Sequence, residues 1–97
     1  GYIDEHYAES LTLAEAAGKF GYAPNYFSSL FKRYFRIGFA QYVNSVRVRK
    51  SIPLLKTQKA SSVCYDCGFR SPQQYFLNFR KVFGCTPYEY LHDKHTG

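Results

Sequence analysis

Residues 60–91 read ASSVCYDCGFRSPQQYFLNFRKVFGCTPYEYL, and the pattern of this segment occurs twice in the chain. Residues 13–43 carry the same pattern at a shift of 47 to 48 positions. In each copy a short apolar-patterned segment ends at a glycine, and a small residue and a proline follow. A pattern repeated at fixed distance predicts two copies of one supersecondary unit.

The first segment of each copy has apolar residues at i, i+3, i+4 and i+7, which is the spacing of one helical face. They are Leu13, Ala16, Ala17 and Phe20 in the first copy and Ala60, Val63, Cys64 and Cys67 in the second. Gly21 and Gly68 follow directly, and glycine just past a helix adopts the left-handed conformation that ends it. The sequence therefore predicts two short helices that stop at these glycines.

A second helix is predicted after each turn. Ala23-Pro24 and Ser71-Pro72 each place a cap residue before a proline, which needs no N–H partner at the first helical position. The inward faces are expected to be Phe27, Leu30, Phe31 and Tyr34 in the first copy and Tyr75, Phe79 and Phe83 in the second, and the remaining Tyr and Phe residues are also assigned to the core. A short helix, a turn of three to four residues and a second helix form a helix-turn-helix unit.

One long helix is expected between the two copies. Its inward residues would be Tyr42, Val43, Val46 and the stem of Lys50, and Pro53 should kink or shorten its C-terminal end. Capping boxes are predicted at Thr12-x-x-Glu15, Ser71-x-x-Gln74 and Thr86-x-x-Glu89, which makes Gln74 a capping side chain.

The expected fold is therefore all-α, with about seven helices in a single domain over residues 1–97. It divides into a first helix-turn-helix subdomain at about 1–37, a linker helix at about 39–56 and a second subdomain at about 57–93. A chain of 97 residues has room for one core of this size, and no window reaches the roughly 18 apolar residues that span a bilayer. We expect no membrane segment and a cytoplasmic location.

The charge distribution favours a phosphate-binding surface. Residues 19–81 hold twelve of the thirteen Lys and Arg residues but only one acid, Asp66, and the formal net charge is +6. Neutralising phosphates releases condensed counterions and strengthens binding to nucleic acid. A solvated basic surface that only keeps the domain soluble is the alternative interpretation.

Other chemistries have little support. Cys64 and Cys67 form a C-x-x-C pair, and Cys85 is a third thiol, but the pair falls on a buried helical stripe and no second pair completes a tetrahedral metal site. We expect no metal and no cofactor. The sequence contains no nucleophile with a matched base, no phosphate-binding glycine loop and no paired acids, so no enzymatic activity is expected.

The repeated pattern resembles the DNA-binding domain of AraC/XylS transcription regulators over about residues 10–91. The first half carries Leu13-x-Glu15-Ala16-Ala17-x-x-Phe20-Gly21-Tyr22-x-Pro24-x-Tyr26-Phe27-x-x-Leu30-Phe31-Lys32 and then Phe39-x-x-Tyr42-Val43-Asn44-x-Val46-Arg47. The second half carries Cys67-Gly68-Phe69-x-Ser71-x-x-x-Tyr75-x-x-x-Phe79-Arg80-Lys81-x-Phe83-Gly84-x-Thr86-Pro87-x-Glu89-Tyr90. Arg36, where the family usually has glycine, Lys59, where it usually has a Ser or Thr cap, and Pro53 depart from the pattern.

The resemblance implies sequence-specific binding of double-stranded DNA, with the two second helices entering adjacent major-groove segments. Matched to the family's base-facing positions, the expected base-reading residues are Asn25, Ser28, Ser29, Pro72, Gln73, Phe76 and Leu77. The expected phosphate contacts are Arg33, Arg36, Arg47, Arg49, Arg70, Arg80 and Lys81. Asn and Gln bond to adenine edges, whereas Phe and Leu contact thymine methyl groups.

The family also implies a wider setting. We expect the chain to be the C-terminal output part of a longer bacterial regulator, with a sensing or dimerisation domain before it, RNA polymerase as a further partner and the nucleoid as its location. Two rival interpretations stay open. One is a basic helical adaptor that binds RNA or protein without reading a DNA sequence, and the other is a thiol or zinc protein.

Overall fold

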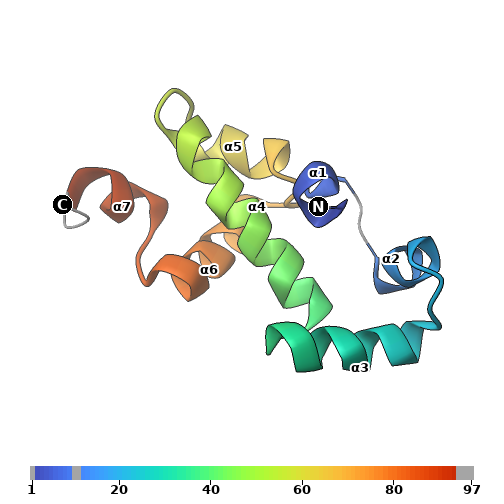
Figure 1. Cartoon of the computed structure of the whole chain (residues 1–97). Helices are drawn as coiled ribbons and strands as arrows, with labels where there is room; N and C mark the ends of the chain where they lie inside the picture. Colours follow the sequence, from blue (N-terminus) through green and yellow to red (C-terminus); the bar gives the residue numbers. More distant parts are fainter. Residues whose placement is uncertain (1, 10–11, 94–97) are drawn as a thin grey trace.

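The computed structural model describes residues 2–9 and 12–93, and every regular element in these ranges is a helix (Figure 1). The seven helices are α1 (Tyr2–His6), α2 (Leu13–Lys19), α3 (Pro24–Phe35), α4 (Phe39–Leu55), α5 (Ala60–Asp66), α6 (Pro72–Phe83) and α7 (Pro87–Asp93). The predicted all-α class and the helix count are confirmed. The short helix α1 has no counterpart among the elements located from the sequence pattern.

The repeat seen in the sequence is also a repeat in structure. The helix pair α2 and α3 is followed, 47 and 48 positions later, by the pair α5 and α6. Gly21 and Gly68 have φ values of 81° and 96°, the left-handed conformation expected at both turns. The first turn has the expected four residues, 20–23, whereas the second has five, 67–71, one more than predicted.

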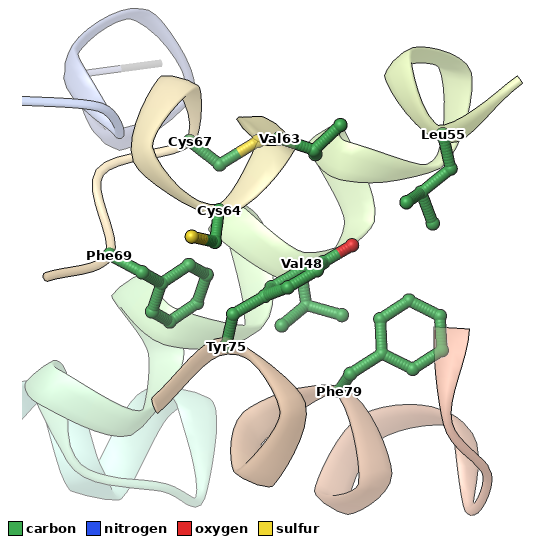
Figure 2. Close-up of a cluster of buried hydrophobic side chains, with 8 residues drawn as sticks. All are labelled: Val48, Leu55, Val63, Cys64, Cys67, Phe69, Tyr75 and Phe79. Carbon is green, nitrogen blue, oxygen red and sulfur yellow. The ribbon is translucent and has the colours of Figure 1, made fainter. Parts of the chain in front are cut away.

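Two clusters of buried side chains form the core, and α4 contributes to both. The first cluster consists of Ala16, Ala17, Phe27, Phe31, Phe39 and Val43. The second consists of Val48, Leu55, Val63, Cys64, Cys67, Phe69, Tyr75 and Phe79, which Figure 2 shows converging from α4, α5, the turn 67–71 and α6. We call α2 and α3 with the first cluster the first unit, and α5, α6 and α7 with the second cluster the second unit. Since α4 supplies residues to both, its N-terminal half belongs to one core and its C-terminal half to the other.

The expectation that all aromatic residues are buried is wrong. Phe20 and Tyr34, assigned to inward stripes, are exposed, and Tyr34 reaches 80% exposure. The further exposed aromatics assigned to the core are Tyr22, Tyr26, Phe35, Tyr65 and Tyr88, and Phe76, expected to face a base, is exposed as well. Tyr34 is exposed because the two helices differ in length. Helix α3 has twelve residues and α2 only seven, so the last turn of α3 extends past α2. Lys50 is likewise exposed, and the fully buried residues on that part of α4 are Val48 and Ser51.

Capping explains where several helices begin. Thr12 with Glu15, and Thr86 with Glu89, form reciprocal capping boxes before α2 and α7, as predicted. Before α6 only half of the expected box forms within the described residues, since Ser71 Oγ accepts the Gln74 backbone N–H at 3.3 Å. Helix α4 continues through Pro53 and ends two residues later, at Leu55, one residue before the expected end at about 56.

Candidate nucleic-acid interface

The N-terminal half of α3 presents a polar outer face. Asn25, Ser28 and Ser29 are exposed, while Phe27 and Phe31 on the opposite side are buried in the first core. Proline at the first helical position, after Ala23, starts the helix without leaving an unpaired N–H at that position. The three polar side chains are therefore carried on one rigid helix with their functional groups toward solvent.

The N-terminal half of α6 presents the matching face of the second unit. Gln73 is exposed, and Phe76 and Leu77 are 37% and 51% exposed. Pro72 is only half-buried, and the inward side of the helix carries Tyr75, Asn78 and Phe79. Large apolar side chains exposed beside a glutamine are suited to apolar contact with a partner.

The two faces are equivalent in register but differ in chemistry. Asn25 and Gln73 each follow the proline that opens their helix, 48 positions apart, so the two amides occupy the same place in each unit. One helical turn further, Ser28 of the first unit corresponds to Phe76 of the second. A carboxamide can bond the N6 and N7 edge of adenine, a hydroxyl accepts or donates to several bases, and an apolar side chain can only touch a methyl group.

The side chain of Gln74 does not have the capping role assigned to it from the sequence. Its backbone N–H is bound by Ser71 Oγ, and its carbonyl accepts a 2.9 Å hydrogen bond from Asn78 Nδ2. The carboxamide itself makes no hydrogen bond within the described part of the chain, and the residue is exposed. Gln74 is thus a polar side chain adjacent to Gln73 that is available to a ligand.

Six of the seven cations expected to contact phosphates are exposed. They are Arg33, Arg36, Arg49, Arg70, Arg80 and Lys81. Arg33 and Lys81 occupy the same position in the last turns of α3 and α6, where cations also interact favourably with the helix dipole. Among the side chains that the structure describes, none of the six forms an ion pair with an acid.

Arg47 is placed differently from the other cations. It is half-buried on α4, where Nε donates to the Tyr7 carbonyl at 2.6 Å and Nη2 donates to the Glu9 carbonyl at 2.9 Å. Burial lowers the pKa of Arg47, but a guanidinium in a protein stays protonated. These two bonds could not be predicted from the sequence, because the pattern that identified Arg47 does not reveal which backbone segment packs against it.

A hollow of about 700 Å³ opens beside Arg47. It is lined by Ala8, Glu9 and Thr12 of the N-terminal region, Asn44 and Arg47 of α4, Tyr65 of α5, Gly68, Phe69 and Arg70 of the turn, and Gln74 of α6. The hollow lies between the N-terminal region, α4 and the start of α6, so it adjoins the outer face of the second unit. Sequence periodicity could not have located it, because its lining comes from three segments distant in the chain, 8–12, 44–47 and 65–74.

The cysteine pair is built into the core. Cys64 and Cys67 are free thiols with no solvent exposure, and both lie in the second cluster (Figure 2). Burial raises the pKa of Cys64, and it raises that of Cys67 to about 11, with a smaller contribution from Asp66. Both thiols are therefore protonated at neutral pH. Among the described residues, His, Cys, Asp and Glu do not gather in a group of three that would hold a metal ion.

Among the helices of residues 2–9 and 12–93, none combines the length and the apolar character that crossing a membrane requires.

Comparison with known proteins adds independent information. A family model described as a helix-turn-helix domain matches residues 7–93. The transcriptional regulator YijO of Escherichia coli K12 is 38% identical over 97 residues, covering 98% of this chain and 34% of YijO. The regulatory protein PocR of Salmonella typhimurium is 34% identical over 91 residues, covering 92% of this chain and 30% of PocR. The chain thus spans about a third of the length of these curated relatives.

Solved structures match the whole arrangement of helices. The DNA-binding domain of AdpA, a global transcriptional factor, in complex with a target DNA superimposes with a TM-score of 0.85 at 25% identity, covering 98% of this chain and 87% of that one. An AraC-type transcriptional regulator from Chromobacterium violaceum superimposes with a TM-score of 0.86 at 22% identity, covering 99% and 88% of the two chains. At 22% identity this second likeness bears on the fold alone.

Proposed function

This chain belongs to the AraC-type helix-turn-helix family, and from that premise we propose that it reads a specific double-stranded DNA sequence in order to regulate transcription. In this proposal α3 and α6 each enter the major groove. The two units act as one bipartite reader within a single polypeptide, and binding involves no chemical reaction.

The observation that carries the proposal is the pair of equivalent amides. Asn25 and Gln73 are exposed at the second residue of their helices, each on a helix whose opposite face is packed into a core. A recognition helix contacts base edges through its N-terminal residues. We therefore assign base reading to Asn25, Ser28 and Ser29 in α3, and to Pro72, Gln73, Phe76 and Leu77 in α6.

The exposed cations supply affinity in this proposal. Arg33, Arg36, Arg49, Arg70, Arg80 and Lys81 are assigned to phosphate contacts. Such contacts set the register of the protein on the duplex but do not distinguish sequences. Binding is therefore expected to weaken steeply with salt, because each neutralised phosphate releases counterions.

Each of the two proposed helix-turn-helix subdomains packs around one of the two core clusters. One helix-turn-helix subdomain covers about residues 1–37 and the other about 57–93, with α4 as the linker between them. Helix α4 has 17 residues, so it is about 25 Å long at 1.5 Å per residue. Reader helices that enter one face of the duplex must lie about 34 Å apart along it. If their separation falls short, the DNA bends toward the protein, at a cost of a few kcal/mol.

We further propose the setting in which the domain works. Its relatives YijO and PocR are about three times as long as this chain, which supports a role as the DNA-binding part of a longer regulator with a sensing or dimerisation domain. A regulator of this kind acts on the bacterial nucleoid in the cytoplasm, and RNA polymerase is the partner through which it would change transcription.

Selection from a random duplex pool tests the function. The purified chain should enrich a two-part motif with its halves about one helical turn apart, and the enriched duplex should stay bound in excess random DNA. Salt-sensitive binding without enrichment of any motif would contradict the proposal and would favour a basic adaptor for RNA or protein. Binding of the selected duplex should be measured over a range of salt concentrations, since the slope reports the number of phosphate contacts.

A further inference from the structure

The two units are bridged by a second segment besides α4. Ile3 of α1 packs against the first core, and Tyr7, just after α1, packs against the second. The ring of Tyr7 also lies 5.9 Å from Lys50 Nζ on α4. The N-terminal segment therefore touches both cores and the helix between them, and Figure 1 shows α1 beside α4.

Arg47 fastens this segment in place. Its Nε and Nη2 atoms donate to the carbonyls of Tyr7 and Glu9. The two hydrogen bonds therefore diverge from a single planar guanidinium, as the two prongs of a fork do. The guanidinium carbon also lies 5.9 Å from the centre of the Phe69 ring, within the range of a cation–π interaction. A planar fork holds two acceptors in a fixed geometry, which a flexible lysine ammonium does not.

Gly68 completes the contact from the side of the second unit. A Cβ atom at this position would lie 3.0 Å from the Cα and O atoms of Ala8 and 3.0 Å from Arg47 Nε. The turn before α6 and the backbone at Ala8 thus approach as closely as a glycine allows. We call Arg47, the backbone of residues 7–9 and Gly68 the clasp.

We propose that Arg47 is a positioning residue whose hydrogen bonds to Tyr7 and Glu9 hold the two helix-turn-helix units in a fixed relative placement, and so determine which half-site spacing the domain accepts. This inference rests on the proposed DNA-reading function. It replaces the phosphate-contact role expected for Arg47 from the sequence. Two of the guanidinium nitrogens are committed to backbone carbonyls, and the residue is half-buried.

Arg47→Lys tests the clasp because it keeps the positive charge and removes the fork. Binding is measured to the selected duplex, to variants with one base pair added or removed between the half-sites, and to each half-site alone. The preference of the variant for the selected spacing should fall about tenfold, equivalent to roughly 1.4 kcal/mol. Half-site affinity and the salt slope should not change. Unchanged spacing preference, or a uniform loss on all duplexes with a smaller salt slope, would overturn the inference.

Gly68→Ala provides a second test that involves no charge, and Gly21→Ala is its matched control. Both glycines have positive φ values at equivalent turns, but a Cβ at Gly21 would have no atom within 4 Å. Both variants carry the backbone strain of a positive φ, but Gly68→Ala also presses on the backbone of Ala8, so its stability should fall further than that of Gly21→Ala. Only Gly68→Ala should lose spacing preference, and equal preferences in the two variants would count against the clasp.

A measurement without DNA separates this inference from the proposed function. Spin labels at Lys32→Cys on α3 and Lys81→Cys on α6, in a Cys85→Ser background, report the distance between the two units. The distance distribution should be narrow with Arg47 present and broader in Arg47→Lys. An unchanged distribution would refute the clasp even if DNA reading is established. If the wild-type chain showed no DNA sequence preference, the proposed function would be refuted. The distance measurement would still decide whether the clasp holds the two units in place.

Discussion

The hydroxyl of Tyr75 donates a 2.7 Å hydrogen bond to Ser51 Oγ, and neither residue has any solvent exposure. Ser51 in turn donates to the carbonyl of Val48 within α4. This short chain of bonds joins α6, the proposed reader of the second unit, to the linker helix through the middle of an apolar core. A buried polar group that loses its partner costs about 1–3 kcal/mol, so the pair should be sensitive to which partner is removed.

Ser51→Ala should therefore destabilise the chain more than Tyr75→Phe. In Ser51→Ala the phenol stays buried without an acceptor, whereas in Tyr75→Phe the serine keeps its bond to Val48 and the loss is about 1 kcal/mol. The double variant should cost no more than Ser51→Ala alone, because no polar group is left unpaired. Urea unfolding of the three variants measures the difference, and a larger cost for Tyr75→Phe would contradict this account of the bond.

Arg36 and Gly84, which stand at equivalent positions, allow the cost of a left-handed backbone to be measured by opposite substitutions. It has φ 71° at the end of α3, and Gly84 has φ 76° at the equivalent position after α6. A left-handed conformation costs a residue with a Cβ about 1–2 kcal/mol, partly offset by the greater flexibility of glycine in the unfolded chain. Arg36→Gly should raise the free energy of unfolding by about 0.5–1 kcal/mol, even though it removes a charge.

Gly84→Ala is the matched control for Arg36. Open space surrounds Gly84, so an added Cβ meets no atom within 4 Å and the change isolates the backbone cost. The expected loss is about 1 kcal/mol by the same reasoning. Thermal unfolding of both variants gives the comparison. If Arg36→Gly destabilises the chain, the arginine side chain must make a stabilising contact that outweighs its strained backbone.

Helix positions were predictable from the sequence because they depend on local patterns. Glycines at turns, prolines at first helical positions and Thr-x-x-Glu boxes act within a few residues, and the structure has helices where these signals placed them. Burial was less predictable. Tyr34 lies on the same helical face as Phe27, but its exposure depends on how far α2 extends opposite it, which is a tertiary property.

The outer faces of α3 and α6 were likewise predictable, whereas the contacts of Arg47 were not. Asn25 and Gln73 are exposed where a helical wheel puts them. Arg47 meets carbonyls 40 and 38 positions earlier in the chain, and backbone acceptors have no sequence signature. The same holds for the bond between Tyr75 and Ser51, which joins residues 24 positions apart.

The buried Cys67 thiol predicts a loss of stability at alkaline pH. Burial raises its pKa from 9.0 to about 11 in the folded chain, so the unfolded chain releases this proton first as the pH rises. The stabilisation is fully present below pH 9 and is lost as the pH increases toward 11. Urea midpoints across this range should therefore decline, and Cys67→Ala should show a shallower decline. Equal slopes would mean that the thiol does not contribute.

Gln73→Ala should change which sequences are bound rather than whether DNA is bound. If its carboxamide reads one base pair, its loss should relax preference at that position by roughly 1–3 kcal/mol and leave binding to random DNA nearly intact. Asn25→Ala should do the same at the equivalent position of the other half-site. Lys81→Gln is the contrasting variant, since a lost phosphate contact weakens all sequences alike and lowers the salt slope by about one. Repeating the selection with each variant distinguishes these outcomes. An equal loss on specific and random duplexes for Gln73→Ala would assign that side chain to the DNA backbone.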